Sequence, residues 1–417
     1  MDLALYHPEL GYYVRAAQRS GRAGDFFTSV DVGPLFGELL EIQLAVMADL
    51  LQSTAEHAKP AEKTLSSASS AFSPVPVFDL VEAGAGNGRL SADILEAARR
   101  RHPAFYESLR LHLVEASATA RAAQRTTLAD AADRLVFSGD ALPASFDGVL
   151  IANELLDAMP VHQVVMRADG LREIYVSSKS QVPRSKSASS KSQVPRSKSA
   201  VASRKSQVAG RDSRLETRDS RLETWNVELG TVEGPPSTPA LEAYLDRLGV
   251  SLEPGWRVEI NLRAIDWVRE AARRLERGFM ILVDYGHEAR ELYSATHSAG
   301  TLTSFSGHRS AGPESSPNTL PWLQQPGERD LTAHVDFTSV RAAAEAEGMT
   351  TIGFLDQTYF LMGLLEQLPD PQSAIRNPQL KTLIMPGGLG STHKVLILGK
   401  GVGAPALKGC SFSRRVT

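Results

Sequence analysis

The stretch that decides the fold of this chain is Phe78-Asp-Leu-Val-Glu82 followed by Ala83-Gly-Ala-Gly-Asn-Gly-Arg89. An apolar run ends at an acid, three glycines alternate with other residues, and apolar residues at helical spacing begin at Leu90. This order predicts a buried strand, a tight turn and a helix, which is the first βα unit of a doubly wound α/β sheet. Glycines allow positive φ angles and let a ligand approach the backbone, and the start of a helix offers unpaired N–H groups. We therefore expect a nucleotide-like cofactor at this turn.

The spacing of the glycines separates two classes of cofactor. A dinucleotide fingerprint needs its third glycine three positions after the second, where this chain has Arg89. A nicotinamide-dependent oxidoreductase is therefore disfavoured. Gly84, Gly86 and Gly88, preceded by Glu82, instead resemble motif I of class I S-adenosylmethionine (SAM) methyltransferases. A glycine-rich turn that binds no ligand is the alternative, so the rest of the chain has to decide.

The composition excludes several classes of protein. A chain of 417 residues is long enough for one elaborated domain or two, and its net charge of -3 gives no reason to expect a nucleic-acid or anionic membrane partner. Its one cysteine, Cys410, excludes an intrachain disulfide framework. No apolar stretch approaches the ~20 residues that span a bilayer, and the first residues resemble neither a signal nor a transit peptide. We expect a soluble cytoplasmic protein without membrane insertion.

Acids follow the next two strands that the pattern predicts. Glu115 ends the strand Leu111–Glu115, where nucleotide-binding sheets commonly place an acceptor for ribose hydroxyls. Asp140 follows the strand Arg134–Phe137 and could meet an adenine amino group. Because turns favour Asp in any case, each acid alone is more often a structural cap than a ligand.

The fourth predicted strand, Phe146–Ala152, runs into a polar loop that begins with Asn153 and Glu154 and continues to Asp157. Open α/β sheets bind their ligands at this end of the strands. Two carboxylates can hold an arginine guanidinium in bidentate fashion, whereas Asn153 suits a neutral amide or amine. We predict that these three residues are catalytic. A helix cap with solvated acids is the alternative.

Two further segments supply candidate ligand contacts. Asp25, in a polar and aromatic cluster beside Gly24, suits a loop that closes over a ligand, although a capped turn explains it equally well. The polar span 300–337 is long and irregular, which is typical of functional segments. Besides Asp330, the predicted substrate contacts are His162, His308, Arg309, His334 and Asp336. His334 and Asp336 could mimic a metal pair, but no third ligand has a suitable spacing, so no metal is predicted.

The chain contains one region of a different kind. Residues 178–189 recur almost unchanged as 190–201, and residues 211–217 are copied as 218–224. These repeats contain almost no apolar side chains and cannot build a core, so they predict a disordered insertion. The predicted organisation is an N-terminal element (1–52), a methyltransferase domain in two parts (74–176 and 225–400) with a substrate-facing insertion (300–337), the repeats (177–224) and a flexible tail (401–417).

Longer strings in the chain resemble the MidA-like family of SAM-dependent methyltransferases, which includes a mitochondrial complex I assembly factor that dimethylates a protein arginine. They are Leu5-Tyr-x-Pro-x-x-Gly-Tyr-Tyr13, Gly24-Asp-Phe-Phe-Thr-Ser29, Val81-Glu-x-Gly-x-Gly-x-Gly88, Asn153-Glu-Leu-Leu-Asp-Ala-x-Pro-Val-His162, Val283-Asp-Tyr-Gly-His287 and Asp330-Leu-Thr-Ala-His-Val-Asp-Phe337. The resemblance implies a Rossmann-like fold with a mostly parallel seven-stranded sheet and helices on both faces. It also implies S-adenosyl-L-methionine as the cofactor.

The resemblance implies roles for individual residues as well. Glu82, Gly84, Gly86 and Gly88 would line the methionine end of SAM, Glu115 its ribose, Asp140 its adenine, while Asp25 would close the pocket and Glu154 and Asp157 would face the acceptor. The implied acceptor is a protein arginine, on a subunit of a respiratory complex. The alternative is a non-catalytic SAM-binding assembly factor. Whether the chain forms a homodimer is left open.

Overall fold

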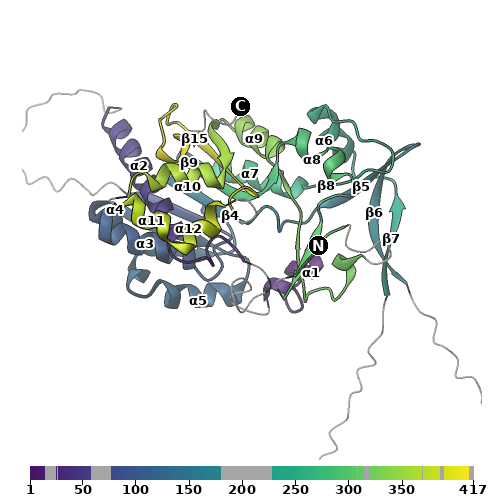
Figure 1. Cartoon of the computed structure of the whole chain (residues 1–417), viewed down its shortest axis with the longest axis horizontal. Coiled ribbons are helices and arrows are strands. Elements are labelled where there is room, and N and C mark those ends of the chain that lie inside the picture. Colours follow the sequence, from purple (N-terminus) through teal and green to yellow (C-terminus); the bar gives the residue numbers. More distant parts are fainter. Residues whose placement is uncertain are drawn as a thin grey trace, which may run out of the picture. The chain divides into compact units, whose positions relative to one another are not determined.

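The computed structural model describes residues 1–14, 25, 27–57, 77–179, 228–307, 309–313, 320–368, 370–385 and 389–412 (Figure 1). The chain divides into two compact units, Met1–Tyr175 with Glu233–Thr417, and Val176–Val232. The first unit contains the central sheet and its helices. In the second unit, the described residues belong to two strands, and most of the predicted repeats (180–224) lie outside the described residues.

The central sheet has the strand order β14-β15-β9-β4-β1-β2-β3, and the short strand β13 pairs with β9. The strands on the path are β1 (Phe78–Ala83), β2 (Leu109–Val114), β3 (Leu135–Gly139), β4 (Phe146–Asn153), β9 (Leu275–His287), β14 (Thr350–Asp356) and β15 (His393–Lys400), with β13 at Val335–Asp336. Strands β1 to β4, β9 and β13 pair in parallel, whereas β15 runs antiparallel to β9 and β14. The predicted mostly parallel α/β sheet is confirmed. Seven strands were predicted, and β13 adds a further strand of two residues beside them.

Side chains alternate between two hydrophobic cores along the central strands. In β9, Phe279 and Ile281 belong to one core, and Met280 and Leu282 belong to the other. Successive residues of a strand point to opposite faces, so both faces of this sheet are buried. This is why the strands read as continuous apolar runs in the sequence.

Helices cover each face of the sheet (Figure 1). The first core is built with α2 (Leu35–His57), α3 (Arg89–Arg101), α4 (Pro103–Ser108), α5 (Ala118–Leu128), α10 (Gln357–Leu365) and α12 (Pro378–Ile384). The second core is built with α6 (Ala240–Leu248), α7 (Leu262–Arg274), α8 (Ala289–Leu292) and α9 (Phe337–Ala346). The short α11 (Pro371–Arg376) precedes α12.

Polar side chains at the helix starts set where several of these helices begin. Ser117 accepts a hydrogen bond from the backbone N–H of Ala120 at the start of α5, and Asn261 accepts one from Ala264 at the start of α7. Asp336 accepts hydrogen bonds from Thr338 and Ser339 at the start of α9. Such caps satisfy N–H groups that have no partner within the helix.

Two smaller sheets accompany the central one. One has the order β7-β6-β5-β8 and the other the order β11-β10-β12. Their strands are β5 (His162–Arg167), β6 (Gly170–Lys179), β7 (Glu228–Gly234) and β8 (Arg257–Ile260), and β10 (Thr303–Ser306), β11 (Arg309–Ala311) and β12 (Asp330–Thr332). The span 300–337 is therefore less irregular than predicted. Its strands have only three or four residues, too few to show a clear alternation of polar and apolar side chains.

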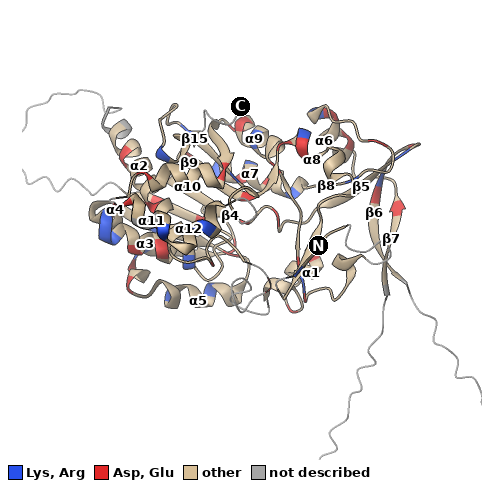
Figure 2. Ribbon diagram, viewed as in Figure 1, with Lys and Arg blue, Asp and Glu red and all other residues tan. Residues whose placement is uncertain are grey.

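The N-terminal element packs against this span. Leu5 of α1 (Asp2–Tyr6) and Tyr12 of the 3-10 helix η1 (Tyr12–Val14) share a third core with Leu302, Trp322 and Leu331. Acidic and basic residues are interspersed over the helices (Figure 2). Among the residues that the structure describes, no helix combines the length and apolar character needed to cross a bilayer.

Candidate active site

A cavity of about 760 Å³ lies at the carboxyl ends of β1, β2, β4 and β9. The glycine turn after β1 and the loop 153–160 after β4 line it, together with the N-terminal element and residues from the β11-β10-β12 sheet. Segments that lie far apart in the chain, from Asp2 to Thr332, therefore meet where an open α/β sheet is expected to bind its ligand. Cavities of this size hold small-molecule ligands.

The glycine turn has the backbone shape that its sequence predicts. Gly84, Gly86 and Gly88 have φ angles of 72°, 51° and 85°, a region that strains other residues. The backbone N–H of Gly84 donates to the carbonyl of Val114 at 2.9 Å, which fixes the turn against β2. A Cβ atom added at Gly86 would meet no protein atom within 4 Å. The turn therefore leaves open space beside Gly86 at the edge of the cavity.

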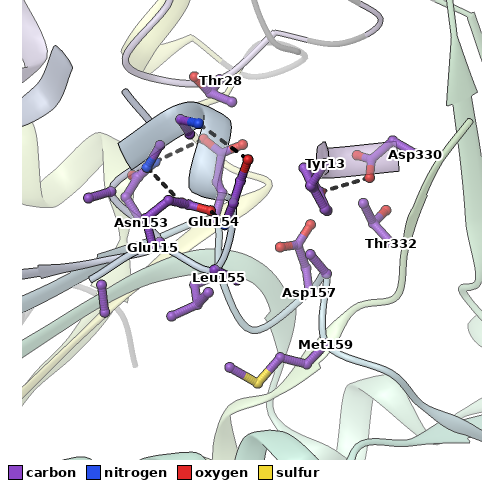
Figure 3. A pocket seen from close by; sticks show the side chains of 18 of the residues that line it. Tyr13, Thr28, Glu115, Asn153, Glu154, Leu155, Asp157, Met159, Asp330 and Thr332 are labelled. Carbon is purple, nitrogen blue, oxygen red and sulfur yellow. Dashed lines mark hydrogen bonds between the residues drawn. The ribbon is translucent and has the colours of Figure 1, made fainter. Parts of the chain in front are cut away.

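Glu115 holds the other side of this turn. Its two carboxylate oxygens accept hydrogen bonds from the backbone N–H groups of Gly86 at 2.8 Å and Ser117 at 2.7 Å. Each oxygen keeps a second lone pair that can accept from a ligand hydroxyl. Glu115 and Asn153 both line the cavity (Figure 3).

Glu82 lines the cavity from the end of β1. Burial raises the pKa of this carboxyl to about 7, although hydrogen bonds from the side chain and backbone of Ser91 oppose the shift. Ser91 lies in the first turn of α3, so this contact ties the strand to the helix that follows it. Near neutral pH, Glu82 can therefore hold or release a proton.

Asp284, at the end of β9, shapes the loop that follows β4. Its Oδ2 accepts hydrogen bonds from the backbone N–H groups of Leu155 at 3.1 Å, Leu156 at 2.8 Å and Asp157 at 3.4 Å. Burial raises the pKa of Asp284 to about 7. Glu154, where the loop turns, has a φ angle of 51°, which is uncommon for a residue with a side chain. Strain of this kind persists only where surrounding contacts hold it, and Asp284 supplies them.

Glu154 connects the loop to distant parts of the chain. Its Oε1 accepts hydrogen bonds from the backbone N–H of Ser29 at 3.1 Å and from Nδ2 of Asn153 at 3.3 Å. The same oxygen lies 3.4 Å from Nε2 of the buried His393 on β15. These contacts hold the Glu154 carboxylate at the wall of the cavity.

Asp157 has a buried carboxyl oxygen without a partner. The residue is 4% exposed, and its Oδ1 forms no hydrogen bond with the described part of the chain. Burial raises the pKa of Asp157 well above its usual value, and the charges of Asp284, Glu154 and Asp330 raise it further. Figure 3 shows its carboxylate pointing into the space between Glu154 and the pair formed by Tyr13 and Asp330. A buried acceptor without a partner is costly, so it marks a place for a ligand donor.

Aromatic side chains form the opposite wall. The Tyr13 hydroxyl donates to Oδ1 of Asp330 at 2.8 Å, and the Tyr6 hydroxyl donates to the carbonyl of Ala158 at 3.1 Å. The Tyr6 and Tyr13 rings lie 5.6 Å apart, and Tyr285 from β9 also lines the cavity. Burial raises the pKa of Asp330 to about 6, while the bond from Tyr13 opposes this.

Positive charge is scarce at this wall. Among the described residues that line the cavity, the arginines are Arg89 and Arg263, and Arg263 already pairs with Asp2. Glu154, Asp157 and Asp330 thus surround one space. In the hydrogen bonds and ion pairs given above, none of these three acids has an arginine or lysine partner. Such a space suits a cationic ligand.

The predicted site residues divide into two groups. Those that line the cavity are Glu82, Gly84, Gly86, Glu115, Asp140 and Asp25 among the cofactor candidates, and Asn153, Glu154 and Asp157 among the catalytic ones. Gly88 lies behind the turn, where an added Cβ would meet Leu113 at 3.2 Å. Asp25 accepts hydrogen bonds from the Tyr12 hydroxyl at 2.8 Å and the Gly307 N–H at 2.7 Å, so it joins the N-terminal element to the β10–β11 turn.

Most of the predicted substrate contacts lie elsewhere. His162 bonds to Glu173 at 2.8 Å between neighbouring strands, and Asp336 caps α9 and accepts from the Tyr244 hydroxyl. Arg309 lies on β11 and His334 precedes β13, and neither lines the cavity. His308 lies outside the described residues. A polar residue in a functional-looking span is often a cap or a sheet contact, and composition does not distinguish these roles.

Several residues at the cavity escaped the sequence prediction. Tyr6, Tyr13 and Tyr285 line it, although none of them was among the predicted site residues. Asp284 lies at the end of a buried strand, a position that predicts a site, but its role in holding the loop after β4 depends on a partner 127 to 129 residues earlier.

The chain matches a protein family in sequence and two solved structures in fold. The family described as "Putative S-adenosyl-L-methionine-dependent methyltransferase" matches residues 61–355. The crystal structure of a superfamily member from Burkholderia thailandensis, bound to S-adenosyl-homocysteine, has a TM-score of 0.73 and 25% identity to this chain. The match covers 99% of this chain and 89% of the other. A second structure from that organism, at 24% identity and a TM-score of 0.69, covers 98% and 87% and shows the same fold.

Curated relatives match over most of their length. Protein arginine methyltransferase NDUFAF7, mitochondrial, from Mus musculus is 26% identical over 388 residues, which are 87% of this chain and 69% of that protein. Its homolog from Drosophila melanogaster is 28% identical over 444 residues, 96% of this chain and 80% of the relative. The named relatives are mitochondrial, so the expected cytoplasmic location is wrong. That expectation rested on the single cysteine, on the lack of a bilayer-spanning run and on first residues that resemble neither a signal nor a transit peptide.

Proposed function

This chain belongs to the family of S-adenosyl-L-methionine-dependent methyltransferases, and we propose that it transfers the methyl group to an arginine side chain of a protein. The predicted family, the class I methyltransferase activity and the SAM cofactor are confirmed by the family match and by the similar structure that holds S-adenosyl-homocysteine. The identity of the acceptor is our proposal.

The observation that carries the proposal is the unpartnered oxygen of Asp157 in an acidic cavity. Asp157 Oδ1 is buried without a hydrogen bond to the described residues, and Glu154 and Asp330 are close enough to raise its pKa. Uncharged acceptors would leave these carboxyls without a countercharge. A guanidinium supplies five N–H donors in a planar fork and a permanent charge, which matches several carboxylate oxygens at once.

The carboxylates would position the acceptor nitrogen and receive its proton. SAM supplies a methyl group bound to a positively charged sulfur. As an acceptor nitrogen forms its bond to the methyl carbon, the carbon–sulfur bond breaks with its electron pair moving to sulfur, and the nitrogen loses one proton. Asp157 and Glu154 would hold the guanidinium so that its positive charge stays away from the reacting nitrogen. Either carboxylate could then accept the proton and pass it to solvent.

The tyrosines would complete the acceptor pocket. The Tyr6 and Tyr13 rings are fixed by hydroxyl bonds to Ala158 and Asp330, so their positions are set before a ligand binds. Aromatic faces attract cations and exclude water, which strengthens the carboxylate contacts. Neutral substrates would gain less from this wall.

The glycine turn would hold the cofactor. We assign Glu82, Gly84 and Gly86 to the methionine end of SAM, because they line the cavity at the end of β1. Glu115 would receive the ribose hydroxyls, and Asp140, exposed at the rim, the adenine. Gly88 would act through the shape of the turn, since it does not line the cavity.

Names of relatives support the choice of a protein acceptor. The curated relatives are called protein arginine methyltransferases. At 26% and 28% identity they support the family more strongly than the acceptor, and the choice of arginine rests on the unpartnered Asp157 oxygen in the acidic cavity. We keep a subunit of a respiratory complex as the proposed acceptor protein. Isolated respiratory complexes, incubated with the enzyme and methyl-labelled SAM, would show which subunit gains label.

Peptide acceptors test the proposal directly. Release of S-adenosyl-homocysteine would be measured with matched peptides that present arginine, lysine, glutamine or alanine at one position. We expect turnover with arginine, and Asp157→Asn should lower it by about 100-fold, because one charge-assisted contact contributes about 1.5–3 kcal/mol. SAM affinity, measured by calorimetry, should change less than about twofold since Asp157 lies beyond the glycine turn.

The matched control is Asp93→Asn. Asp93 also has a buried carboxyl oxygen without a partner among the described residues and a pKa raised to about 6 by burial, but it does not line the cavity. Its substitution should leave arginine turnover unchanged. Turnover with lysine or glutamine peptides but not arginine, or an equal loss in both variants, would contradict the proposed acceptor.

A further inference from the structure

Three histidines from separate segments meet outside the cavity. His287 ends β9, His297 ends the 3-10 helix η3 (Ala295–His297), and His334 precedes β13. One ring nitrogen from each lies within 4.8 Å of the others. Their ring centroids are separated by 4.8 Å, 5.3 Å and 5.9 Å. None of the three lines the cavity described above.

One hydrogen bond fixes which nitrogen of the His297 ring carries the hydrogen. His297 Nδ1 lies 3.0 Å from the backbone carbonyl of Glu291. A carbonyl oxygen can only accept, so Nδ1 carries the hydrogen and Nε2 of the neutral ring keeps a free lone pair. Metal-bound histidines commonly have this arrangement, in which one nitrogen donates to a carbonyl or carboxylate while the other binds the ion.

The other two rings have buried nitrogens without hydrogen bonds. His287 Nδ1 and His334 Nδ1 form none with the described residues. Glu291 Oε1 lies 3.0 Å from His287 Nδ1 but without the alignment of a hydrogen bond. His334 Nδ1 is therefore buried without a partner, and His287 Nδ1 has the Glu291 carboxylate beside it. One nitrogen of each ring converges with the third histidine, and this arrangement calls for a shared ligand. A carboxylate is close enough to join them.

We propose that His287, His297 and His334 bind one divalent transition-metal ion, of which zinc fits best, with Glu291 as a fourth ligand or as a partner of His287. Imidazole nitrogen suits zinc and its neighbours, whereas calcium and magnesium prefer oxygen. Zinc–nitrogen bonds of about 2.0–2.1 Å place tetrahedral ligand atoms about 3.4 Å apart. Half-buried rings need to move inward by less than about 1.5 Å to reach this geometry.

The ion would fasten the wall of the acceptor pocket. His287 lies two residues after Tyr285, and His334 lies two residues after Thr332, both of which line the cavity. Ala333, beside His334, donates its backbone N–H to the Asp157 carbonyl at 3.0 Å. A metal bound by the triad would therefore hold β9 and the segment that carries Asp330 in a fixed relation.

The sequence did not reveal this site because the three histidines are far apart in the chain. The gaps between positions 287, 297 and 334 match no compact metal motif, and the pair His334 and Asp336 had suggested a different combination. In the structure, Asp336 caps α9 and faces Tyr244 instead. Only the fold brings the three rings together.

Metal titration of the full-length protein tests the proposal. After treatment with a chelator, Zn²⁺ should bind with a stoichiometry of one per chain and raise the melting temperature, because an ion that binds the folded state stabilises it. Co²⁺ at the same site should give the visible absorption of a tetrahedral complex. His297→Ala should weaken Zn²⁺ binding by more than about tenfold, since even partners of metal ligands contribute that much.

His102→Gln is the matched control, because His102 is half-exposed, contacts Glu41 and lies far from the triad in the sequence. It should retain full zinc binding and the cobalt spectrum. Circular dichroism and SAM binding would establish that both variants are folded. Failure to bind zinc, or binding that persists unchanged in folded His297→Ala protein, would overturn the proposal.

Discussion

The Tyr13 hydroxyl donates a 2.8 Å hydrogen bond to Asp330 Oδ1, although 317 positions separate the two residues. Tyr13 belongs to the N-terminal element and Asp330 to β12, and both line the cavity. This wall of the cavity, the proposed acceptor side, is therefore completed only when the N-terminal element packs against β12. This contact also lowers the pKa of a carboxyl that burial raises to about 6.

Tyr13→Phe removes the hydroxyl and keeps the ring. Since the Tyr13 bond lowers the pKa of Asp330, its loss should raise that pKa and leave more of the carboxyl protonated near neutral pH. We expect KM for an arginine peptide to rise about fivefold, the effect of about 1 kcal/mol, and to recover partly at higher pH. The measurement is kcat/KM against pH. Tyr359→Phe, on α10 away from the cavity, should leave the profile unchanged, and an identical shift in both variants would contradict the role of Tyr13.

Gly86→Ala should weaken SAM binding beyond its effect on stability. Both Gly86 and Gly249 have positive φ angles, 51° and 61°, and at neither would an added Cβ meet a protein atom within 4 Å. The backbone cost should therefore be similar in both alanine variants, about 1 kcal/mol. Only Gly86 lines the cavity, so only its variant should lose SAM affinity in calorimetry. Equal SAM affinity in the two variants would show that the cofactor does not approach this part of the turn.

Asp330→Asn should change the pH dependence of stability in a defined direction. Burial raises the pKa of Asp330 from 3.8 to about 6, so between these values the folded protein binds more protons than the unfolded chain. The stability from Asp330 is therefore full below the unfolded pKa and is lost as pH rises through the folded pKa. Relative to the parent protein, the Asn variant should gain melting temperature between about pH 4 and pH 7.

Exposed Asp133 is the control for this titration. Its hydrogen bond with Arg134 lowers its pKa below the ordinary 3.8, so the stability that it contributes is already full above about pH 4 and is weak because the site is exposed. The relative melting temperature of Asp133→Asn should therefore stay nearly constant between about pH 4 and pH 7. Thermal melts of all three proteins over this pH range make the comparison. A relative melting temperature of Asp330→Asn that falls with pH would contradict the assigned shift.

Asp284→Ala should release the loop that carries Glu154 and Asp157. The substitution leaves three backbone N–H groups without their acceptor, those of Leu156 and Asp157 buried and that of Leu155 partly buried. We expect a loss of about 1–3 kcal/mol in the free energy of unfolding for the buried groups left unpaired, together with a loss of methyl transfer. Denaturant unfolding gives the first quantity and S-adenosyl-homocysteine release the second. Asp147→Ala, at an exposed position of β4, should affect neither.

The sequence by itself determined the architecture and the shape of the glycine turn. Alternate glycines after an apolar strand permit few conformations, and the three φ angles follow from them. A strand that is buried on both faces has an unbroken run of apolar residues in the sequence. Such runs are why β1, β4 and β9 could be located from the sequence. These signals are local, since each depends on residues a few positions apart.

Only the tertiary structure decided which polar residues share the cavity. The sequence singled out Asp157, Asp330, His162 and Asp336 on similar grounds, yet two line the cavity, one bonds within a sheet and one caps a helix. The tyrosine wall and the histidine triad were equally hidden, because their members come from distant segments. Periodicity and spacing report neighbours along the chain, whereas burial, pKa and hydrogen bonding depend on neighbours in space. That physical difference is why the glycine turn could be predicted from sequence and the acceptor wall could not.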